Sequence, residues 1–303
     1  MADLSVNIAG IPFKNPVIAA SGCFGFGEDY EDLYPVSRLG GISLKGTTLE
    51  PRDGNPVPRI AECTAGMLNS VGLQNPGGRA FVEEELPRVL GKGTVLIANA
   101  AGSTAESYCE LIDLLDASPV DMIELNISCP NVKEGGMAFG ATCEGAAAIT
   151  KAVRPRTKKP LMVKLSPNVT DIVSIAKACE AQGADALSLI NTVLAMRIDI
   201  RTRRPVLRQN VGGLSGPAVF PLAVRMVWQT ANAVNIPVVG LGGIETWENA
   251  AEMMMAGAAA VQVGAAMFWD PWAPIKIIDG LARYCDGNGI RKVSELTGSV
   301  RPW

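Results

Sequence analysis

The chain alternates eight times between a short apolar run and a longer stretch with helical spacing. The apolar runs have the length of buried strands and lie at 16–20, 41–45, 94–99, 121–126, 161–165, 186–190, 237–241 and 259–263. The clearest helical stretches are 79–90, 105–115, 171–182, 217–233 and 247–256. Eight strand–helix units in one domain predict an α/β fold, a single (β/α)8 TIM barrel over 1–303. An open doubly wound sheet is the alternative, but no G-x-G-x-x-G follows the first run.

Two connections are longer than ordinary barrel loops. Segment 46–78 contains four prolines, and segment 193–216 carries Arg197, Arg201, Arg203, Arg204 and Arg208. Both follow predicted strands, so we interpret them as insertions at the C-terminal face of the strands, where long loops commonly shape a site. The arginine run is expected to be a solvated or partner-facing loop.

Composition narrows the class of protein. Apolar residues make up 48% of the chain and charged residues 19%, which suits strands covered on both faces. A net charge of −3 gives no reason to expect nucleic acid. The sequence shows no export signal and no apolar run long enough to span a membrane, so a cytoplasmic protein is expected. The seven cysteines include no C-x-x-C pair and the chain has no histidine, so no metal site is predicted.

Segment 126–131, Asn-Ile-Ser-Cys-Pro-Asn, begins where the predicted strand 121–126 ends, and a glycine-rich run follows it. Cys129 is therefore expected in a loop beside two amides and a hydroxyl. Because the chain has no histidine, proton transfer near neutral pH needs another group, and cysteine has the nearest unperturbed pKa. Cys129 is the first candidate for a general base. The alternative is that it is a small buried hydrophobic residue.

Polar residues or glycines end nearly every predicted strand. They are Ser21, Lys45, Gly46, Asn99, Asn126, Lys164, Asn191, Thr192, Gly242, Gly243, Gly264 and Ala265. In a barrel the strand ends meet at one face, which is where active sites lie. The glycine turns after the last two strands suit a phosphate, because glycine lets backbone N–H groups approach an anion closely. The alternative is that glycine simply fits tight turns.

Lys164 lies in an apolar strand and is expected to point into the barrel mouth, where an ammonium needs a negative partner. Three roles are open: a Schiff-base nucleophile, a counter-charge to an anionic cofactor, or one half of a structural ion pair. Lys45 raises the same question from the second strand. Two lysines converging on one cavity favour an anion-binding site.

Five motifs resemble, in sequence and order, those of the dihydroorotate dehydrogenases, and the resemblance covers essentially the whole chain. They are NISCPN at 126–131, NSVGLQNPG at 69–77, KLSP at 164–167, NT at 191–192 and GLSGP at 213–217. Residues 132–136 and 70–73 most resemble the NAD-linked, type 1B catalytic subunit. The resemblance implies FMN in the barrel mouth and oxidation of dihydroorotate to orotate in pyrimidine biosynthesis.

The resemblance also implies roles for individual residues. Cys129 would remove the C5 proton while a hydride leaves C6 for flavin N5. The substrate would be held by Lys45, Asn69, Ser70, Val71, Gly72, Leu73, Asn126, Asn191 and Thr192. FMN would be held by Ser21, Lys45, Gly46, Asn99, Asn126, Lys164, Ile190, Gly216, Gly242, Gly243, Gly264 and Ala265. Many relatives have threonine where Ala265 stands, so phosphate binding there would rely on the backbone.

The type 1B resemblance further implies a partner that this chain does not encode. The partner would be an iron–sulfur flavoprotein subunit that carries FAD and a [2Fe–2S] cluster and passes electrons to NAD⁺. Two catalytic and two electron-transfer chains would form a heterotetramer. The present sequence is consistent with this division, since it shows neither a dinucleotide fingerprint nor a cluster cysteine pattern.

Several other functions compete with this one. A fumarate-linked dihydroorotate dehydrogenase would differ in its electron acceptor. A dihydropyrimidine dehydrogenase-like enzyme would take uracil or thymine, whereas Lys45 favours a carboxylated substrate. A Schiff-base aldolase would use Lys164 and would be colourless, and a phosphate-ligand binding barrel would have no turnover.

Overall fold

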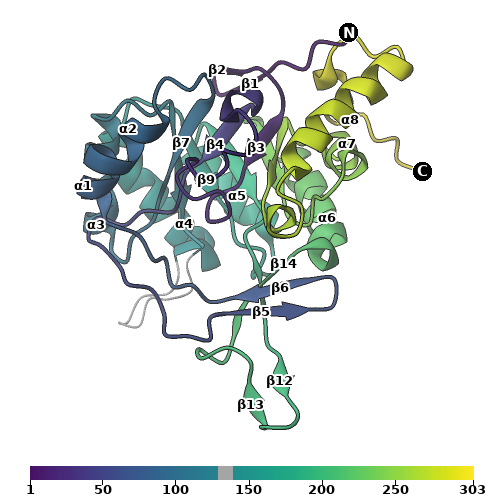
Figure 1. Ribbon diagram of the computed structural model, residues 1–303. Helices are drawn as coiled ribbons and strands as arrows, with labels where there is room; N and C mark the ends of the chain where they lie inside the picture. The colour runs from purple at the N-terminus through teal and green to yellow at the C-terminus, as the bar shows by residue number, and fades with distance from the viewer. Residues whose placement is uncertain (129–138) are drawn as a thin grey trace.

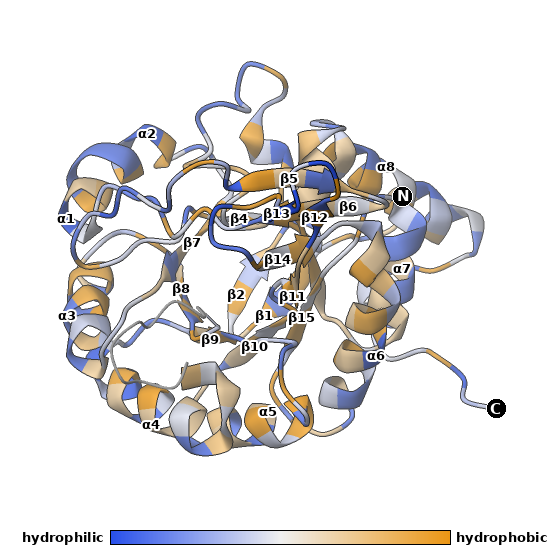
Figure 2. Ribbon diagram, turned by 90° about the horizontal axis from the view of Figure 1, so that it is seen from below, coloured by the Kyte–Doolittle hydropathy of each residue, from blue (hydrophilic) through white to orange (hydrophobic). Residues whose placement is uncertain are grey.

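Eight parallel strands close into a barrel, and helices surround it (Figures 1 and 2). The structure is a computed structural model that describes residues 1–128 and 139–303. In barrel order the strands are β3 (Val17–Ala19), β4 (Gly41–Ser43), β7 (Val95–Ala100), β8 (Met122–Asn126), β9 (Leu161–Lys164), β10 (Ala186–Leu189), β15 (Val238–Leu241) and β16 (Ala260–Val263). Each coincides with one of the eight predicted apolar runs, with only β7 reaching one residue beyond its run, so the predicted (β/α)8 barrel is confirmed.

The helices cover the outside of the barrel and bury their apolar faces against the strands. They are α1 (Gly78–Ala80), α2 (Leu86–Val89), α3 (Ala105–Asp116), α4 (Cys143–Val153), α5 (Ile172–Ala181), α6 (Phe220–Ala231), α7 (Trp247–Met255) and α8 (Ala273–Gly287). A single π-helical turn, Phe81–Glu85, joins α1 to α2, so the predicted helix 79–90 is continuous but irregular. Side chains of Thr104, Asp171 and Thr246 cap α3, α5 and α7 by accepting bonds from backbone N–H groups.

The interior of the barrel is filled by layers of four side chains, each layer contributed by alternate strands. Strand register and the alternation of side chains place Gly41, Met122, Ala186 and Ala260 lowest, with Ile18, Ile97, Met162 and Val239 above them. A polar layer follows: Ser43, Glu124, Ser188 and Gln262. Above it lie Ala20, Asn99, Lys164 and Leu241, and the rim carries Lys45, Asn126, Ile190 and Gly264. The interior therefore changes from apolar to polar toward the C-terminal ends of the strands.

A short N-terminal hairpin, β1 (Val6–Ile8) with β2 (Ile11–Phe13), closes the opposite end of the barrel. Phe13 is buried there, and a Cβ at Gly41 would lie 2.8 Å from its ring. The absence of a side chain at Gly41, at the start of β4, thus leaves space for the Phe13 ring. This hairpin was not among the strands predicted from the sequence.

The two long insertions join into one antiparallel sheet over the barrel mouth, which we call the roof sheet. Its order is β11 (Val193–Ala195), β14 (Gly212–Ser215), β6 (Gly66–Asn69) and β5 (Ile60–Cys63). A further hairpin, β12 (Ile198–Asp199) with β13 (Arg204–Pro205), projects away from the body of the molecule (Figure 1). The predicted placement of the insertions is confirmed, but the sequence did not reveal that they pair with each other.

The predicted arginine run lies on and beside the β12–β13 hairpin. All five arginines of 197–208 are exposed, as expected for a solvated or partner-facing loop. Within the part of the chain that the structure describes, none of the helices combines the length and the apolar character needed to cross a membrane.

Gly280 lets α7 and α8 approach closely, and its replacement should destabilise the fold. A Cβ at Gly280 would lie 2.3 Å from Cγ of Trp247, whereas a Cβ at Gly287, in the same helix, would meet nothing within 4 Å. We expect Gly280→Ala to lower the free energy of unfolding by about 1–3 kcal/mol, because the helices must separate. Gly287→Ala, the matched control, should be neutral or stabilising by up to about 1 kcal/mol. Urea denaturation followed by circular dichroism measures both, and equal effects of the two variants would contradict this account of the packing.

Candidate active site

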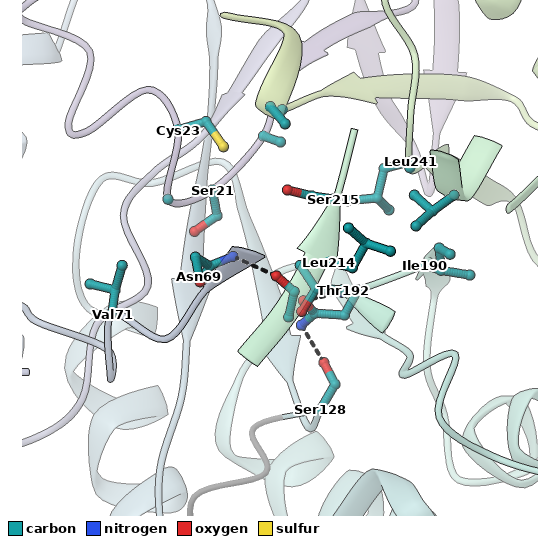
Figure 3. A pocket seen from close by; sticks show the side chains of 18 of the residues that line it. Ser21, Cys23, Asn69, Val71, Ser128, Ile190, Thr192, Leu214, Ser215 and Leu241 are labelled. Atoms are coloured by element: carbon teal, nitrogen blue, oxygen red, sulfur yellow. Dashed lines mark hydrogen bonds between the residues drawn. The ribbon is translucent and has the colours of Figure 1, made fainter. Parts of the chain in front are cut away.

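A cavity of about 780 Å³ lies at the barrel mouth, between the C-terminal ends of the strands and the roof sheet (Figure 3). Its size falls within the usual range for cofactor and small-molecule sites. Every predicted site residue within 1–128 and 139–303 lines this one cavity. Cys129, the predicted base, lies outside the described residues, so its place relative to the cavity stays a prediction. The adjacent Ser128 lines the cavity wall.

Amide and hydroxyl groups at the ends of two barrel strands, β8 and β10, form a hydrogen-bonded chain along one wall. The Asn191 amide donates to Oγ of Ser128 (2.6 Å; dashed line at Ser128 in Figure 3). Ser128 in turn donates to the amide oxygen of Asn126 (2.8 Å). The amide oxygen of Asn191 accepts from the backbone N–H of Thr192 (2.8 Å). On the roof sheet, Asn69 donates to the carbonyl of Gly213. Such fixed donors and acceptors suit a ligand with amide or imide edges.

Lys45 and Cys23 face the same cavity from the first two strand ends. Burial lowers the pKa of Lys45, and the nearby cations Arg59 and Lys164 lower it further against the opposing effect of Cys23. Burial raises the pKa of the Cys23 thiol to about 11 despite Lys164 and Lys45, so this thiol is protonated near neutral pH. Sequence reasoning did not select Cys23.

Lys164 is buried in the layer that floors the cavity, as its place in β9 predicted. Among the residues that the structure describes, no carboxylate forms a direct ion pair with its ammonium. Its charge is instead felt by Glu124, one layer below. Lys164 therefore keeps its ammonium available to the cavity.

Glu124 is fully buried in the polar layer, and sequence reasoning missed it. Its carboxylate accepts hydrogen bonds from Ser43 (2.6 Å), Asn99 (2.6 Å), Ser188 (2.7 Å) and Gln262 (2.8 Å). Burial alone would raise the pKa of Glu124, but Lys164 and these donors outweigh burial and hold the pKa below its ordinary value. The signal in the sequence was the same as for Lys164, a lone charge within an apolar strand.

The glycine turns after β15 and β16 differ in how much space they leave. Gly242 and Gly243 have φ of +122° and +74°, and Cβ atoms there would lie 2.9 Å from Cβ of Ala223 and 2.8 Å from the Gly216 carbonyl. Close packing and backbone conformation are thus sufficient reasons for glycine at this turn. At Gly264 a Cβ would make only ordinary contacts, the nearest at 3.5 Å. At both turns the backbone reaches the cavity without an intervening side chain.

The residues present fit a flavin mononucleotide. The cavity is large enough, two lysines supply positive charge, and glycine turns expose backbone to the cavity. In addition, the amide oxygens of Asn99 and Gln262 are buried without a hydrogen-bond partner among residues 1–128 and 139–303, although both residues line the cavity. Buried polar atoms are rarely left unpaired, so these two oxygens point to a ligand with N–H or O–H groups.

The chain is similar to known proteins of one family. The family model described as dihydroorotate dehydrogenase matches residues 3–284. Relatives from Parabacteroides distasonis and Bacteroides thetaiotaomicron are each 55% identical, with 99% of both chains covered, and one from Geobacter sulfurreducens is 54% identical, with 98% covered. All three are named dihydroorotate dehydrogenase B (NAD(+)), catalytic subunit.

A solved structure shows the same fold. It is the dihydroorotate dehydrogenase of Eimeria tenella in complex with ferulenol, with a TM-score of 0.81, 24% identity, and coverage of 98% of this chain and 88% of that one. The family model matches nearly the whole chain, and the relatives are 54–55% identical over almost their full length. The solved structure has the same barrel fold. We conclude that this chain belongs to the dihydroorotate dehydrogenase family.

Proposed function

We propose that this chain is the FMN-binding catalytic subunit of an NAD-linked dihydroorotate dehydrogenase, which oxidises dihydroorotate to orotate in pyrimidine biosynthesis. The observation that carries the proposal is that residues selected from the sequence, from Ser21 to Ala265, line a single cavity at the barrel mouth. Relatives that are 51–55% identical over nearly their whole length are named as catalytic subunits of the NAD-linked enzyme. Bound FMN would supply the two-electron acceptor for this oxidation.

The side chains divide into two groups in this proposal. Lys45 holds the substrate carboxylate. Residues 69–73, at and after the end of β6, hold the ring amides together with Asn126, Asn191 and Thr192. Ser21, Gly46, Asn99, Lys164, Ile190 and Gly216 surround the flavin, and the turns at Gly242, Gly243, Gly264 and Ala265 take its phosphate. The resemblance assigns Cys129 as the base that removes the C5 proton. The roof sheet lies over the barrel mouth and would limit solvent access to a bound ligand, which would strengthen each of these electrostatic contacts.

Electrons must leave the site once the substrate is oxidised. The relatives' name, catalytic subunit, implies a separate partner chain. We propose that the partner is an iron–sulfur flavoprotein with FAD and a [2Fe–2S] cluster, that two copies of each chain form a heterotetramer, and that the complex works in the cytoplasm.

The purified chain should be yellow, and dihydroorotate should bleach it. Because the flavin is proposed to sit on this chain and the NAD⁺ site on another, dihydroorotate should reduce an artificial acceptor such as a quinone dye, but not NAD⁺, unless the partner is added. Absorbance at flavin and NADH wavelengths measures both. Turnover of dihydrouracil but not dihydroorotate would instead support a dihydropyrimidine dehydrogenase-like enzyme, and reduction of fumarate by the chain alone would support the fumarate-linked type.

Cys129→Ser tests the proposed base. We expect the variant to retain its flavin and to lose about 10²–10⁴-fold in rate near neutral pH, because a serine hydroxyl is a far weaker base than a thiolate. Stopped-flow measurement of flavin bleaching isolates this half-reaction. Cys109→Ser is the control, since Cys109 lies on α3 and bonds the carbonyl of Ala152 away from the cavity. An unchanged bleaching rate in Cys129→Ser would remove this residue from the mechanism.

Lys45 should make orotate binding sensitive to alkaline pH. Its pKa lies below that of an ordinary lysine, chiefly because of burial, so the ammonium is lost at a lower pH than usual. Orotate affinity, read from the flavin spectrum, should therefore be retained below that pKa and fall as pH rises through it. Lys45→Met should weaken binding roughly 10- to 100-fold near neutral pH and abolish this alkaline fall. The exposed Lys158, mutated to Met, should change neither quantity, and a pH profile of Lys45→Met parallel to that of the unmodified protein would refute the assignment.

A further inference from the structure

The carboxylate of Glu124 lies directly beneath the cavity and does not line it. It belongs to the polar layer with Ser43, Ser188 and Gln262, one layer below Asn99 and Lys164. Glu124 is fully buried, and its carboxylate accepts hydrogen bonds from side chains on four other strands. Stability of the barrel alone does not explain a carboxylate at this position, because proteins with an apolar residue of similar size in place of a buried charged group are commonly as stable.

The carboxylate determines which way two amides face. An ionised carboxylate can only accept hydrogen bonds, so Asn99 and Gln262 must turn their NH2 groups toward it. The distances are 2.6 Å from Nδ2 of Asn99 and 2.8 Å from Nε2 of Gln262. Their oxygens consequently point away from Glu124. Both oxygens are buried, and neither has a partner in the part of the chain that the structure describes, although both residues line the cavity. Within residues 1–128 and 139–303, Glu124 thus leaves two acceptor oxygens unpaired in residues of the cavity wall.

The same carboxylate offsets the charge of Lys164. Lys164 is buried in the cavity floor, and Glu124 is the carboxylate whose charge couples to it. Lys45 adds a second positive charge at the rim. The electrostatic environment at the cavity floor is therefore a balance between one buried anion and the ammonium above it.

We infer that Glu124 is a positioning residue for the flavin: it fixes the amide oxygens of Asn99 and Gln262 toward flavin N–H and O–H groups, and its charge limits how strongly Lys164 favours the reduced, anionic flavin. The inference rests on the proposed FMN site and adds to it a residue that never touches the cofactor. It predicts effects on flavin affinity and on flavin potential that have different structural origins and can be measured separately.

Glu124→Gln keeps the shape of the side chain and removes its charge. The NH2 group of the new glutamine would face the NH2 groups of Asn99 and Gln262, and two donors cannot bond to each other. One of these neighbouring amides must therefore rotate, which turns its nitrogen toward the cavity in place of its oxygen. We expect the dissociation constant of FMN, measured by fluorescence quenching on the flavin-free chain, to rise at least about tenfold. We also expect reduced flavin to gain at least about tenfold in affinity relative to oxidised flavin, which raises the two-electron midpoint potential by about 30 mV.

Four further variants separate the effect of charge from the effect of structure. Lys164→Met should shift the potential in the opposite direction, and the double variant should return toward the unmodified value. Ser188→Ala removes one bond to Glu124 but keeps its charge and does not touch the cavity, so it should leave the potential unchanged. Gln262→Met removes one cavity oxygen without changing any charge, so it should weaken FMN binding and leave the potential unchanged.

The outcomes distinguish the inference from the proposed function. If the unmodified chain binds no FMN, the proposed function fails. If it binds FMN and Glu124→Gln matches it in affinity and potential, or Ser188→Ala reproduces the shift in potential, only the inference is overturned. If Glu124→Gln does not fold, Gln262→Met and Lys164→Met still test the inference. An unchanged FMN affinity in Gln262→Met would overturn the inference, and so would an unchanged midpoint potential in Lys164→Met.

Discussion

A single buried carboxylate connects the structure of the barrel to the chemistry at its mouth. Glu124 on β8 accepts hydrogen bonds from side chains on β4, β7, β10 and β16, so it ties together strands from around the whole ring. Leaving such a charge unpaired inside a protein would cost several kcal/mol. The four donors and Lys164 offset that cost, and they can do so only when the strands are in register. The polar layer is thus stable only in the closed, correctly aligned barrel.

Below and above this layer the barrel serves different purposes. The two lower layers are aliphatic side chains, methionines and one glycine, closed off by Phe13, and their burial holds the barrel together through the hydrophobic effect. The layers above carry an asparagine, two lysines and the rim amide of Asn126. Stability is therefore concentrated at the N-terminal ends of the strands, while their C-terminal ends are free to carry polar groups. This division explains why many chemistries can be built on the same fold.

Much of this could be predicted from the sequence because it depends on local patterns. Each barrel strand is an apolar run, and Lys45, Asn99, Asn126 and Lys164 follow or end such runs, so their convergence follows from the fold class. The roof sheet could not be predicted in this way, since β6 and β14 are short, rich in glycine and far apart in sequence. Glu124 was missed for a different reason: it carried the same signal as Lys164, but its partners lie on four separate strands and only the closed barrel reveals them.

The pairing of β6 with β14 has a consequence for how the protein is made. Asn69 and Gly213, which meet in the roof sheet, are 144 residues apart. A chain synthesised from its N-terminus can form the β5–β6 hairpin early, but that hairpin has no neighbour until the ribosome has released β14. Until then its exposed edge is an opportunity for incorrect pairing. The roof sheet is therefore completed only after β14 has been synthesised, although its strands β5 and β6 are translated early.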